Sequence, residues 1–205
     1  MRLYRTTKFQ RALFPSLVWS EKSEDTIYLT FDDGPTEMVT PWVLDELDRV
    51  DGKATFFCLG KNLERNERIA KEILRRDHAI GNHSYEHLNG WKTNLEVYVA
   101  DVEKCDDPLS ELNVKTPLFR PPYGKLTRSQ VRKLNKKKIV MWSYLAWDFA
   151  ELFEEEKALR ALKKAGPGDI VLFHDSQKAF SNLKKILPEL LSHYCEQGLS
   201  LGVLK

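Results

Sequence analysis

The chain has 205 residues, of which 42% are hydrophobic, and this length and composition suit a single domain with one substantial core. Its 32 basic and 30 acidic residues are spread along the sequence and give a formal net charge of +2, which excludes the strongly basic surface typical of nucleic-acid binding. No apolar run approaches the roughly 18 residues that a membrane-spanning helix needs. We therefore expect no transmembrane segment and a substrate that is neutral or of mixed charge.

The first 25 residues are predicted to form a basic lead-in segment, and residues 26–205 a single folded domain. The basic residues of the lead-in are followed, before Pro15, by no apolar segment of signal-peptide length and by no cleavage site of small residues. By default this pattern assigns the protein to the cytoplasm. The cysteines lack Cys-x-x-Cys spacing and fall in predicted strands or helices, so we expect core thiols rather than disulfides at Cys58, Cys105 and Cys195.

The first confident strand is an apolar, β-favouring run from Ile27 to Phe31 that stops at Asp32-Asp33-Gly34-Pro35. Neighbouring strand residues point in opposite directions, so Asp32 and Asp33 need not share a task. One carboxylate can hold a metal ion while the other moves protons. A plain solvated turn would explain the same four residues, because Asp, Gly and Pro are ordinary turn residues.

Strands and helices alternate along the rest of the chain. In order, we expect a helix that begins at Thr40 and ends before Gly52, a strand over 54–59, a helix capped by Asn62 that runs to Arg76, a strand over 79–82, a helix capped by Thr93, a strand at 118–119, a helix over 127–137, a strand over 139–142, a helix that begins near 154, a strand over 169–173, a helix over 180–195 and a strand over 199–204. These patterns amount to about seven strands.

The alternation predicts a parallel α/β arrangement. Because the polar clusters follow the strands, the fold class that we expect is a distorted (β/α)7 barrel, TIM-like, with its site on one rim. A doubly wound open sheet is the alternative.

Two histidines, His83 and His87, follow the predicted strand over 79–82 and are spaced so that one turn can present both imidazoles to a single cation. A separate carboxylate such as Asp33 would complete a three-ligand set that leaves coordination positions open, as catalytic metal sites do. Such a pair of histidines is also found as a structural or surface feature. The same set of two histidines and one carboxylate occurs in non-haem iron oxygenases as well.

Three further polar residues also come after predicted strands. Arg120, next to two prolines, is a rigidly presented guanidinium suited to a carboxylate, and its plainer interpretation is a structural ion pair at a loop entrance. His174 is either a functional residue or a satisfied core histidine. Asp148 is either functional or a helix cap or turn residue.

In their order along the chain, these residues resemble the motif series of the polysaccharide deacetylases, the chitin- and peptidoglycan-deacetylase-like enzymes of carbohydrate esterase family 4, which share the NodB homology domain. The likeness runs from about Thr26 to the carboxyl terminus, and five ordered motifs are far more specific than any one of them. The resemblance implies a distorted barrel and makes residues 26–205 the catalytic domain. The matching segments are Thr30 to Pro35, His83 to His87, Arg120 to Gly124, Asp148, and Leu172 to Asp175.

The resemblance implies a role for each matched residue. Asp33, His83 and His87 would be the ligands of a divalent metal, Zn²⁺ by ligand type, with Co²⁺, Ni²⁺ or Mn²⁺ as alternatives. Asp32 would be the general base, and Arg120 would hold it ionised and oriented.

The resemblance also implies residues for protonating the leaving group, for binding the oxyanion and for lining the substrate pocket. His174 would be the general acid, and Asp148 would be the carboxylate that tunes its pKa. The backbone N–H of Tyr123 would be an oxyanion donor. The substrate pocket would be lined by Leu172, Phe149, Pro121 and Trp142.

The fourth motif departs from the family pattern, which reads Asp-x-x-Asp-Trp. Here Leu145-Ala146-Trp147-Asp148-Phe149 keeps Asp148, but Leu145 replaces the first Asp and Phe149 replaces the Trp. The shape of the acyl pocket is therefore open, and with it the inference that the acyl group is acetyl.

The function implied by the resemblance is metal-dependent hydrolysis of N-acetyl groups from chitin- or peptidoglycan-like oligo- or polysaccharides that contain N-acetylhexosamine. The alternatives are hydrolysis of another non-peptide C–N bond such as a cyclic amide, O-acetyl ester hydrolysis, an iron oxygenase, and a carbohydrate-binding relative without activity. Intact Asp32 and His174 argue against the last. The carbohydrate substrate is the one partner expected; the polymer, its length and the oligomeric state are not predicted.

Overall fold

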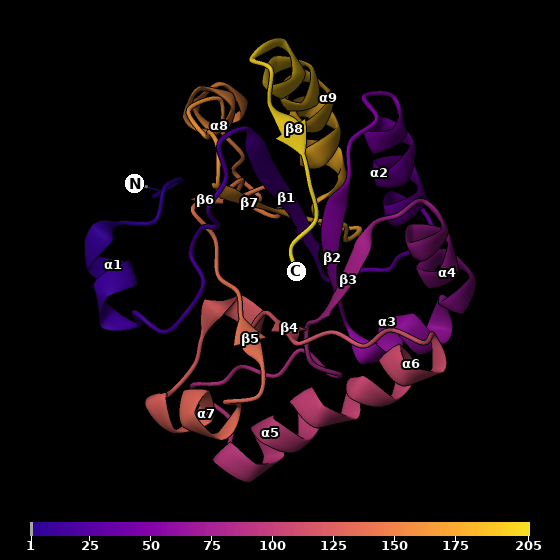
Figure 1. Ribbon diagram of the computed structural model, residues 1–205, viewed down its shortest axis with the longest axis vertical. Coiled ribbons are helices and arrows are strands. Elements are labelled where there is room, and N and C mark those ends of the chain that lie inside the picture. Colours follow the sequence, from indigo (N-terminus) through magenta and orange to yellow (C-terminus); the bar gives the residue numbers. More distant parts are fainter. Residues whose placement is uncertain (1) are drawn as a thin grey trace.

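The protein folds around one curled sheet of parallel strands, seen in a computed structural model that describes residues 2–205. The strand order is β5-β4-β3-β2-β1-β7-β6, and β8 pairs with the amino-terminal end of β1. In Figure 1 these strands follow an arc from β6 through β1 to β5, which is the predicted TIM-like barrel architecture in partly open form. The strands are β1 (Thr26–Asp32), β2 (Ala54–Cys58), β3 (Ala79–Asn82), β4 (Leu118–Phe119), β5 (Lys138–Ile139), β6 (Tyr144–Leu145), β7 (Ile170–His174) and β8 (Ser200–Leu201).

The helices lie outside this arc (Figure 1). Most successive strands are connected by helices, as the apolar periodicity predicts, but β6 follows β5 with no helix between them. Among the helices of residues 2–205, none combines the length and the apolar character that crossing a membrane requires. The helices are α1 (Lys8–Leu13), α2 (Val39–Asp48), α3 (Gly60–Arg65), α4 (Glu67–Arg75), α5 (Leu95–Lys104), α6 (Asp106–Glu111), α7 (Arg128–Lys133), α8 (Glu155–Leu162) and α9 (Phe180–Glu196), with a short 3-10 turn, η1 (Pro122–Gly124).

Strand β1 separates the helix-packed core from the interior of the barrel. Ile27, Leu29 and Phe31 are fully buried and pack in the main hydrophobic cluster under the helices. The Phe31 ring stacks between the rings of Phe56 and Phe173, with centroids at 5.2 and 5.5 Å. Because strand side chains alternate, Asp32 is directed to the opposite face, toward the barrel interior.

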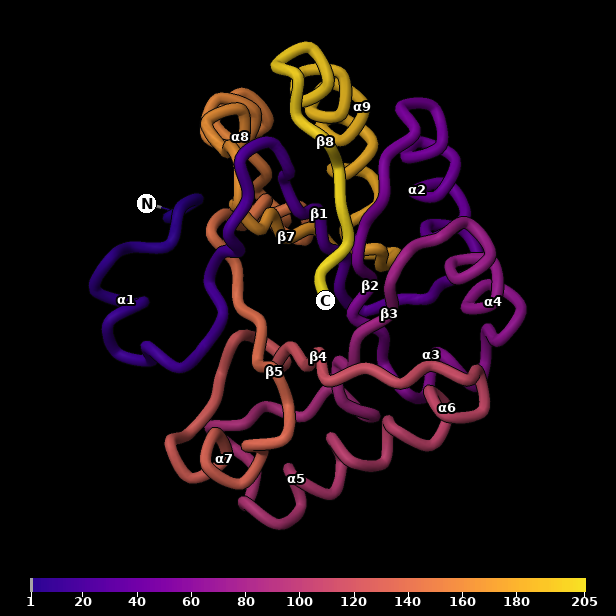
Figure 2. Tube along the Cα trace, viewed as in Figure 1, coloured from indigo at the N-terminus to yellow at the C-terminus, as the bar shows by residue number. Residues whose placement is uncertain are grey.

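The lead-in segment joins the two ends of the arc. Its residues form three bridges: Arg5 with Tyr144, the first residue of β6, Val18 with Val140, the residue after β5, and Ser20 with Asp169, the residue before β7. Figure 2 shows this indigo segment running beside the orange chain of β5 and β6. The division of the chain at residue 25 stays a prediction.

One predicted helix is in fact two. The expected helix from Asn62 to Arg76 breaks at Asn66 into α3 and α4, and Asn62 lies inside α3 rather than capping it. The reason is tertiary: the side-chain amide of Asn62 donates to the Asp33 carbonyl, and that of Asn66 donates to the Pro35 carbonyl. Both asparagines therefore hold the loop that follows β1.

Several other predicted boundaries were also wrong, because side chains are used elsewhere. Helix α2 begins at Val39, and the Thr40 hydroxyl, expected to cap it, instead accepts from the Thr36 N–H. Helix α5 is capped by Asn94, whose side chain accepts from the Glu96 N–H, rather than by Thr93. The strands expected over 139–142 and 199–204 are shortened to β5 and β8, and the helix over 127–137 to α7.

The three cysteines are free thiols, as expected. Cys58 and Cys105 are buried, whereas Cys195 is exposed on α9, so the prediction of a core thiol was wrong for Cys195. Its position falls on the outward face of an amphipathic helix whose opposite face is buried in the core.

Candidate active site

The carboxyl ends of four strands of the sheet bring the predicted site residues together. Asp32 is the last residue of β1 and pairs in register with His174, the last residue of β7. Arg120 follows β4, and His83 follows β3. Carboxyl ends of parallel strands meet at one edge of a sheet, which is why residues far apart in sequence converge here.

Asp33, His83 and His87 form a candidate metal site. Each offers one ligand atom, and these atoms all lie within 4.8 Å of one another. An Asp33 carboxylate oxygen is 3.3 Å from His87 Nε2 and 3.6 Å from His83 Nε2. Burial raises the pKa of Asp33, but the two imidazoles beside it outweigh burial and hold that pKa well below its usual range. This donor set fits a divalent cation of the zinc type.

The orientation of His83 suits a ligand. Its Nδ1 lies 2.8 Å from the Arg120 carbonyl oxygen, so Nδ1 carries the proton and donates to that carbonyl. Its other nitrogen, Nε2, faces Asp33 and is the atom that it would offer to a cation. The imidazole is buried, so this orientation is fixed by packing as well as by the hydrogen bond.

The backbone of both ligand-bearing loops is held in left-handed conformations. Asp33, Ser84 and His87 have φ angles of 80°, 65° and 66°. The Asn82 side chain accepts from the Ser84 N–H and donates to Asp106, while the Ser84 hydroxyl accepts from the His87 N–H. Such backbone conformations persist where surrounding contacts over-determine them, and here they set the direction of the ligand side chains.

Asp32 is held from one side by a buried guanidinium. One of its carboxylate oxygens accepts from Arg120 at 2.8 Å, and the other lies 3.7 Å from His83 Nε2. Arg120 is itself fully buried and donates to the Thr30 hydroxyl and to two backbone carbonyls, Val140 and Met141. Four hydrogen bonds thus fix the position of the Arg120 guanidinium. The Asp32 oxygen that does not bind Arg120 faces the candidate metal site.

His174 and Asp148 form a second charged pair across the site. The His174 Nδ1 is 2.8 Å from one carboxylate oxygen of Asp148, and the other oxygen accepts from the His174 N–H. Burial lowers the pKa of His174, but the charge and the hydrogen bond of fully buried Asp148, helped by Asp33 and Asp32, raise this pKa to about 9. His174 is therefore an imidazolium at neutral pH, with Nδ1 committed to Asp148 and the Nε2 proton available.

Tyr123 and the predicted pocket residues border these groups. Tyr123 has a φ of 59°, and its ring lies edge-on to the His87 ring with centroids 4.5 Å apart. Phe149 lies edge-on to His174 at 4.8 Å. Leu172 is buried and pairs in register with Leu145, while Pro121 is buried and Trp142 is partly buried. The role of each in substrate binding remains a prediction.

Sequence reasoning missed Asp175, which is fully buried beside the site. Its carboxylate accepts from the Gly34 N–H at 3.0 Å and from the Thr40 hydroxyl at 2.5 Å. Burial raises the pKa of Asp175 to about 7. A Cβ on Gly34 would come within 2.0 Å of this carboxylate, so the position requires glycine. The signal available in the sequence was a charged residue directly after a buried strand and His174.

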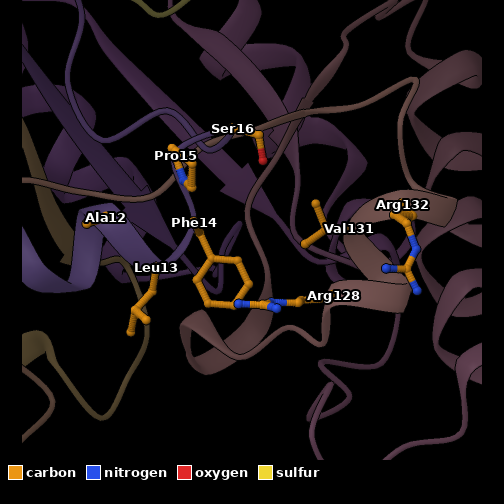
Figure 3. Close-up of a pocket in the computed structure, with 8 residues that line it drawn as sticks. All are labelled: Ala12, Leu13, Phe14, Pro15, Ser16, Arg128, Val131 and Arg132. Atoms are coloured by element: carbon orange, nitrogen blue, oxygen red, sulfur yellow. The ribbon is translucent and has the colours of Figure 1, made fainter.

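A surface hollow of about 420 Å³ lies elsewhere, between the lead-in and α7. Figure 3 shows Phe14 and Arg128 among the residues that line this hollow. None of the candidate site residues lines it. It is therefore separate from the chemistry described above.

Comparison with known proteins identifies the family of this fold and site. The model of the family described as polysaccharide deacetylase matches residues 20–142. The chain belongs to the polysaccharide deacetylase family.

Particular relatives fit this assignment. Two peptidoglycan-N-acetylglucosamine deacetylases of Bacillus cereus are 36% and 37% identical to this chain, over 80% and 82% of its length. The matched region spans 62% of the first of these proteins and 83% of the second. The crystal structure of the Bc1960 peptidoglycan N-acetylglucosamine deacetylase superposes with a TM-score of 0.80 and 30% identity, covering 97% of this chain and 95% of that one.

Proposed function

We propose that this protein is a metal-dependent hydrolase that removes N-acetyl groups from N-acetylhexosamine units of an oligo- or polysaccharide. The observation that carries the proposal is the meeting, at one edge of the sheet, of the Asp33, His83 and His87 cluster with two charged pairs, Asp32 with Arg120 and Asp148 with His174. The names of its relatives, which act on N-acetylglucosamine in peptidoglycan, support this substrate class.

Asp33, His83 and His87 would hold the metal, and Zn²⁺ is the ion that two imidazoles and one carboxylate favour. When bound, such an ion supplies Lewis acidity toward an amide carbonyl and lowers the pKa of a water molecule. Three protein ligands would leave coordination positions open, as catalytic metal sites do. The proposal of zinc over Co²⁺, Ni²⁺ or Mn²⁺ rests on ligand type alone.

Asp32 would accept the proton of the attacking water. Arg120 occupies one of its oxygens, which leaves the oxygen that faces His83 and the candidate metal site to act as the base. Because the guanidinium is fixed by four hydrogen bonds, Asp32 cannot swing away into a different rotamer without breaking a buried ion pair.

His174 would deliver a proton from Nε2 to the sugar nitrogen as the C–N bond breaks. An amine leaves an amide readily only once its nitrogen is protonated, and the charge of Asp148 raises the pKa of His174, which favours the protonated form of this acid. Water thus contributes its hydroxyl to the acyl carbon, while the nitrogen gains a proton, and the products are acetate and a free amino sugar. We assign the backbone N–H of Tyr123 to the oxyanion, and Leu172, Phe149, Pro121 and Trp142 to the substrate pocket.

The test is a screen for acetate release by the full chain, supplied in turn with Zn²⁺, Co²⁺, Ni²⁺ and Mn²⁺. Substrates are N-acetylglucosamine oligomers, peptidoglycan, acetylated xylan and a cyclic amide. We expect acetate from the first two. Release from acetylated xylan alone would identify an ester hydrolase, and ring opening of the cyclic amide without acetate release would identify a hydrolase of another C–N bond.

A further inference from the structure

Two aromatic side chains near the candidate metal site are exposed to solvent. Trp91 is 66% exposed and Tyr123 is 59% exposed, although both are large side chains that a folded protein usually covers. Between them, Lys125 Nζ lies 5.2 Å from the centroid of the Trp91 ring and 5.9 Å from that of the Tyr123 ring. We call these three residues the Trp91–Tyr123 platform.

The Trp91 ring is held in a fixed direction despite its exposure. Its indole N–H donates to the Leu126 carbonyl at 3.1 Å, and its backbone N–H donates to the Asn89 side chain at 3.0 Å. The cation beside the ring restrains it further. A ring that is exposed yet fixed loses little conformational freedom when a ligand covers it.

The two loops that carry the platform are locked together at Gly90. A Cβ there would come within 2.3 Å of the Lys125 carbonyl oxygen, so the backbones approach as closely as glycine allows. The Gln130 side chain, buried under the contact, donates to the Gly90 carbonyl at 2.8 Å. The relative position of the Trp91 and Tyr123 rings is therefore built into the fold rather than left to loop motion.

The platform is continuous with the candidate active site. The Tyr123 ring packs edge-on against His87, with centroids 4.5 Å apart, and His87 belongs to the candidate metal cluster. A glycan held at the candidate metal site and extended in this direction would pass Tyr123 and Lys125 before it reached Trp91. The exposed apolar surface begins where the reacting group would sit and leads away from it.

We propose that the Trp91–Tyr123 platform binds a neighbouring sugar unit of the same glycan, next to the unit that is being deacetylated. The inference rests on the proposed function and deepens it. A pyranose ring has an apolar face of C–H groups that suits the electron-rich face of an indole, and hydroxyl groups at its edge that suit the donors of a lysine ammonium. The ligand class is a hexosamine oligosaccharide of at least two units.

The experiment measures binding and turnover of the N-acetylglucosamine tetramer by the full-length, metal-loaded protein. Binding is measured by calorimetry in an Asp32→Asn background, so that hydrolysis does not consume the ligand. We expect Trp91→Ala to weaken tetramer binding about tenfold, as the loss of one stacked aromatic contact predicts. In the active protein the same change should raise KM by a similar factor with little change in kcat, because stacking stabilises the bound substrate and the transition state alike.

Two further variants serve as controls. Trp91→Phe keeps an aromatic face and should recover most of the lost affinity. Phe9→Ala removes another exposed aromatic ring, which is 73% exposed on α1, and should leave the affinity for the tetramer unchanged. Metal content and melting temperature should be equal in all of these proteins, which separates a lost contact from a disturbed site.

The outcomes distinguish the platform from the reaction. The proposed role of the platform is wrong if Trp91→Ala binds the tetramer as tightly as its parent does. It is also wrong if the parent shows no measurable binding, whatever the turnover of the active protein. A fall in kcat with no change in KM would also overturn it, because the residue would then act on the chemistry. Tenfold weaker binding by Trp91→Ala, in a protein that releases no acetate, would leave the platform standing and overturn the proposed reaction.

Discussion

Asp32 and Asp33 are adjacent in sequence, but the fold gives them different surroundings. Asp32 ends β1 with one oxygen on the buried Arg120 guanidinium. Asp33 has a φ of 80° and turns toward His83 and His87. The change in backbone direction between the two residues is what separates a candidate base from a candidate ligand.

We therefore expect opposite effects of the two amide substitutions on metal content. Asp32→Asn should retain about one divalent ion per chain while turnover falls by roughly 10²- to 10⁴-fold, the usual contribution of a general base. Asp33→Asn should lose metal together with activity. Elemental analysis and acetate release on the same samples make the comparison. Equal loss of metal in both proteins would refute the division of labour.

The pair of His174 and Asp148 leads to a prediction on pH. The acid must be protonated to act, so activity falls as pH rises through the pKa of His174, which the charge of Asp148 helps to raise to about 9. Asp148→Asn removes that charge, so the descending limb of the profile of kcat/KM against pH should move to lower pH. A bound cation lowers the pKa of His174 in both proteins, so both are measured with the same metal. A limb that stays in place, or that persists in His174→Ala, would contradict this assignment of the acid.

At the scale of elements, the end of β7 and the loop after β1 are joined by one buried carboxylate. Asp175 follows β7, accepts from Gly34 and Thr40, and donates its own N–H to the Asp32 carbonyl. Gly34 is next to Asp33, so the carboxylate that fixes Gly34 also fixes the direction of the candidate ligand. Asp175 is thus a positioning residue for the site.

Removing this carboxylate should loosen the loop and weaken metal retention. Asp175→Ala leaves the buried Gly34 N–H without its acceptor, so we expect a loss of roughly 1–3 kcal/mol in the free energy of unfolding and earlier release of metal during dialysis against chelator. Asp175→Asn still offers an acceptor and should retain metal. Thr36→Ala is the matched control, because it removes only a hydroxyl that donates to the Asp175 carbonyl. Faster metal release from the Thr36 protein than from Asp175→Ala would contradict the role of the carboxylate.

The order of elements could be predicted from the sequence, but the role of single polar residues often could not. The spacing of apolar residues reports the strand or helix in which they lie. The order of strands and helices could therefore be predicted from local patterns. The break between α3 and α4 did not, because Asn62 and Asn66 donate to carbonyls of the loop after β1. No local pattern reports a partner about 30 positions away in a chain.

At the scale of the whole molecule, the candidate metal site connects the loops after β1 and β3. Asp33 comes from the first, and His83 and His87 from the second. An ion that binds the folded state alone adds about 2.7 kcal/mol when present at 100 times its Kd. Metal should therefore stabilise the entire fold and not only its site.

We expect exhaustive chelation to lower the melting temperature by roughly 5–10 °C, the shift that this free energy produces in a chain of this size. Calorimetric scans with and without Zn²⁺ would measure it. His83→Ala should show a melting temperature that does not respond to Zn²⁺, together with the loss of activity. A wild-type protein that melts at the same temperature with and without metal, or that turns over fully after chelation, would sink the proposed metal site.

The residues of the candidate site were easier to predict from the sequence than the residues that hold them in position. Asp32 and His174 end their strands, while Asp33, His83 and Arg120 each come directly after one. Parallel topology brings such positions together. The residues that hold them in position are harder to predict because their side chains bind backbone groups of the site loops and do not face the site themselves. Examples are Asp175, whose carboxylate fixes Gly34, and Asn82, whose side chain fixes Ser84.

The lead-in has its pairing partners far along the chain. Arg5, Val18 and Ser20 bridge to Tyr144, Val140 and Asp169. A ribosome makes the chain from the amino end, so the lead-in residues wait unpaired until the stretch that contains Val140, Tyr144 and Asp169 has been synthesised. This segment is therefore made well before its partners, and its docking fills the space between β5 and β6 only once both strands exist.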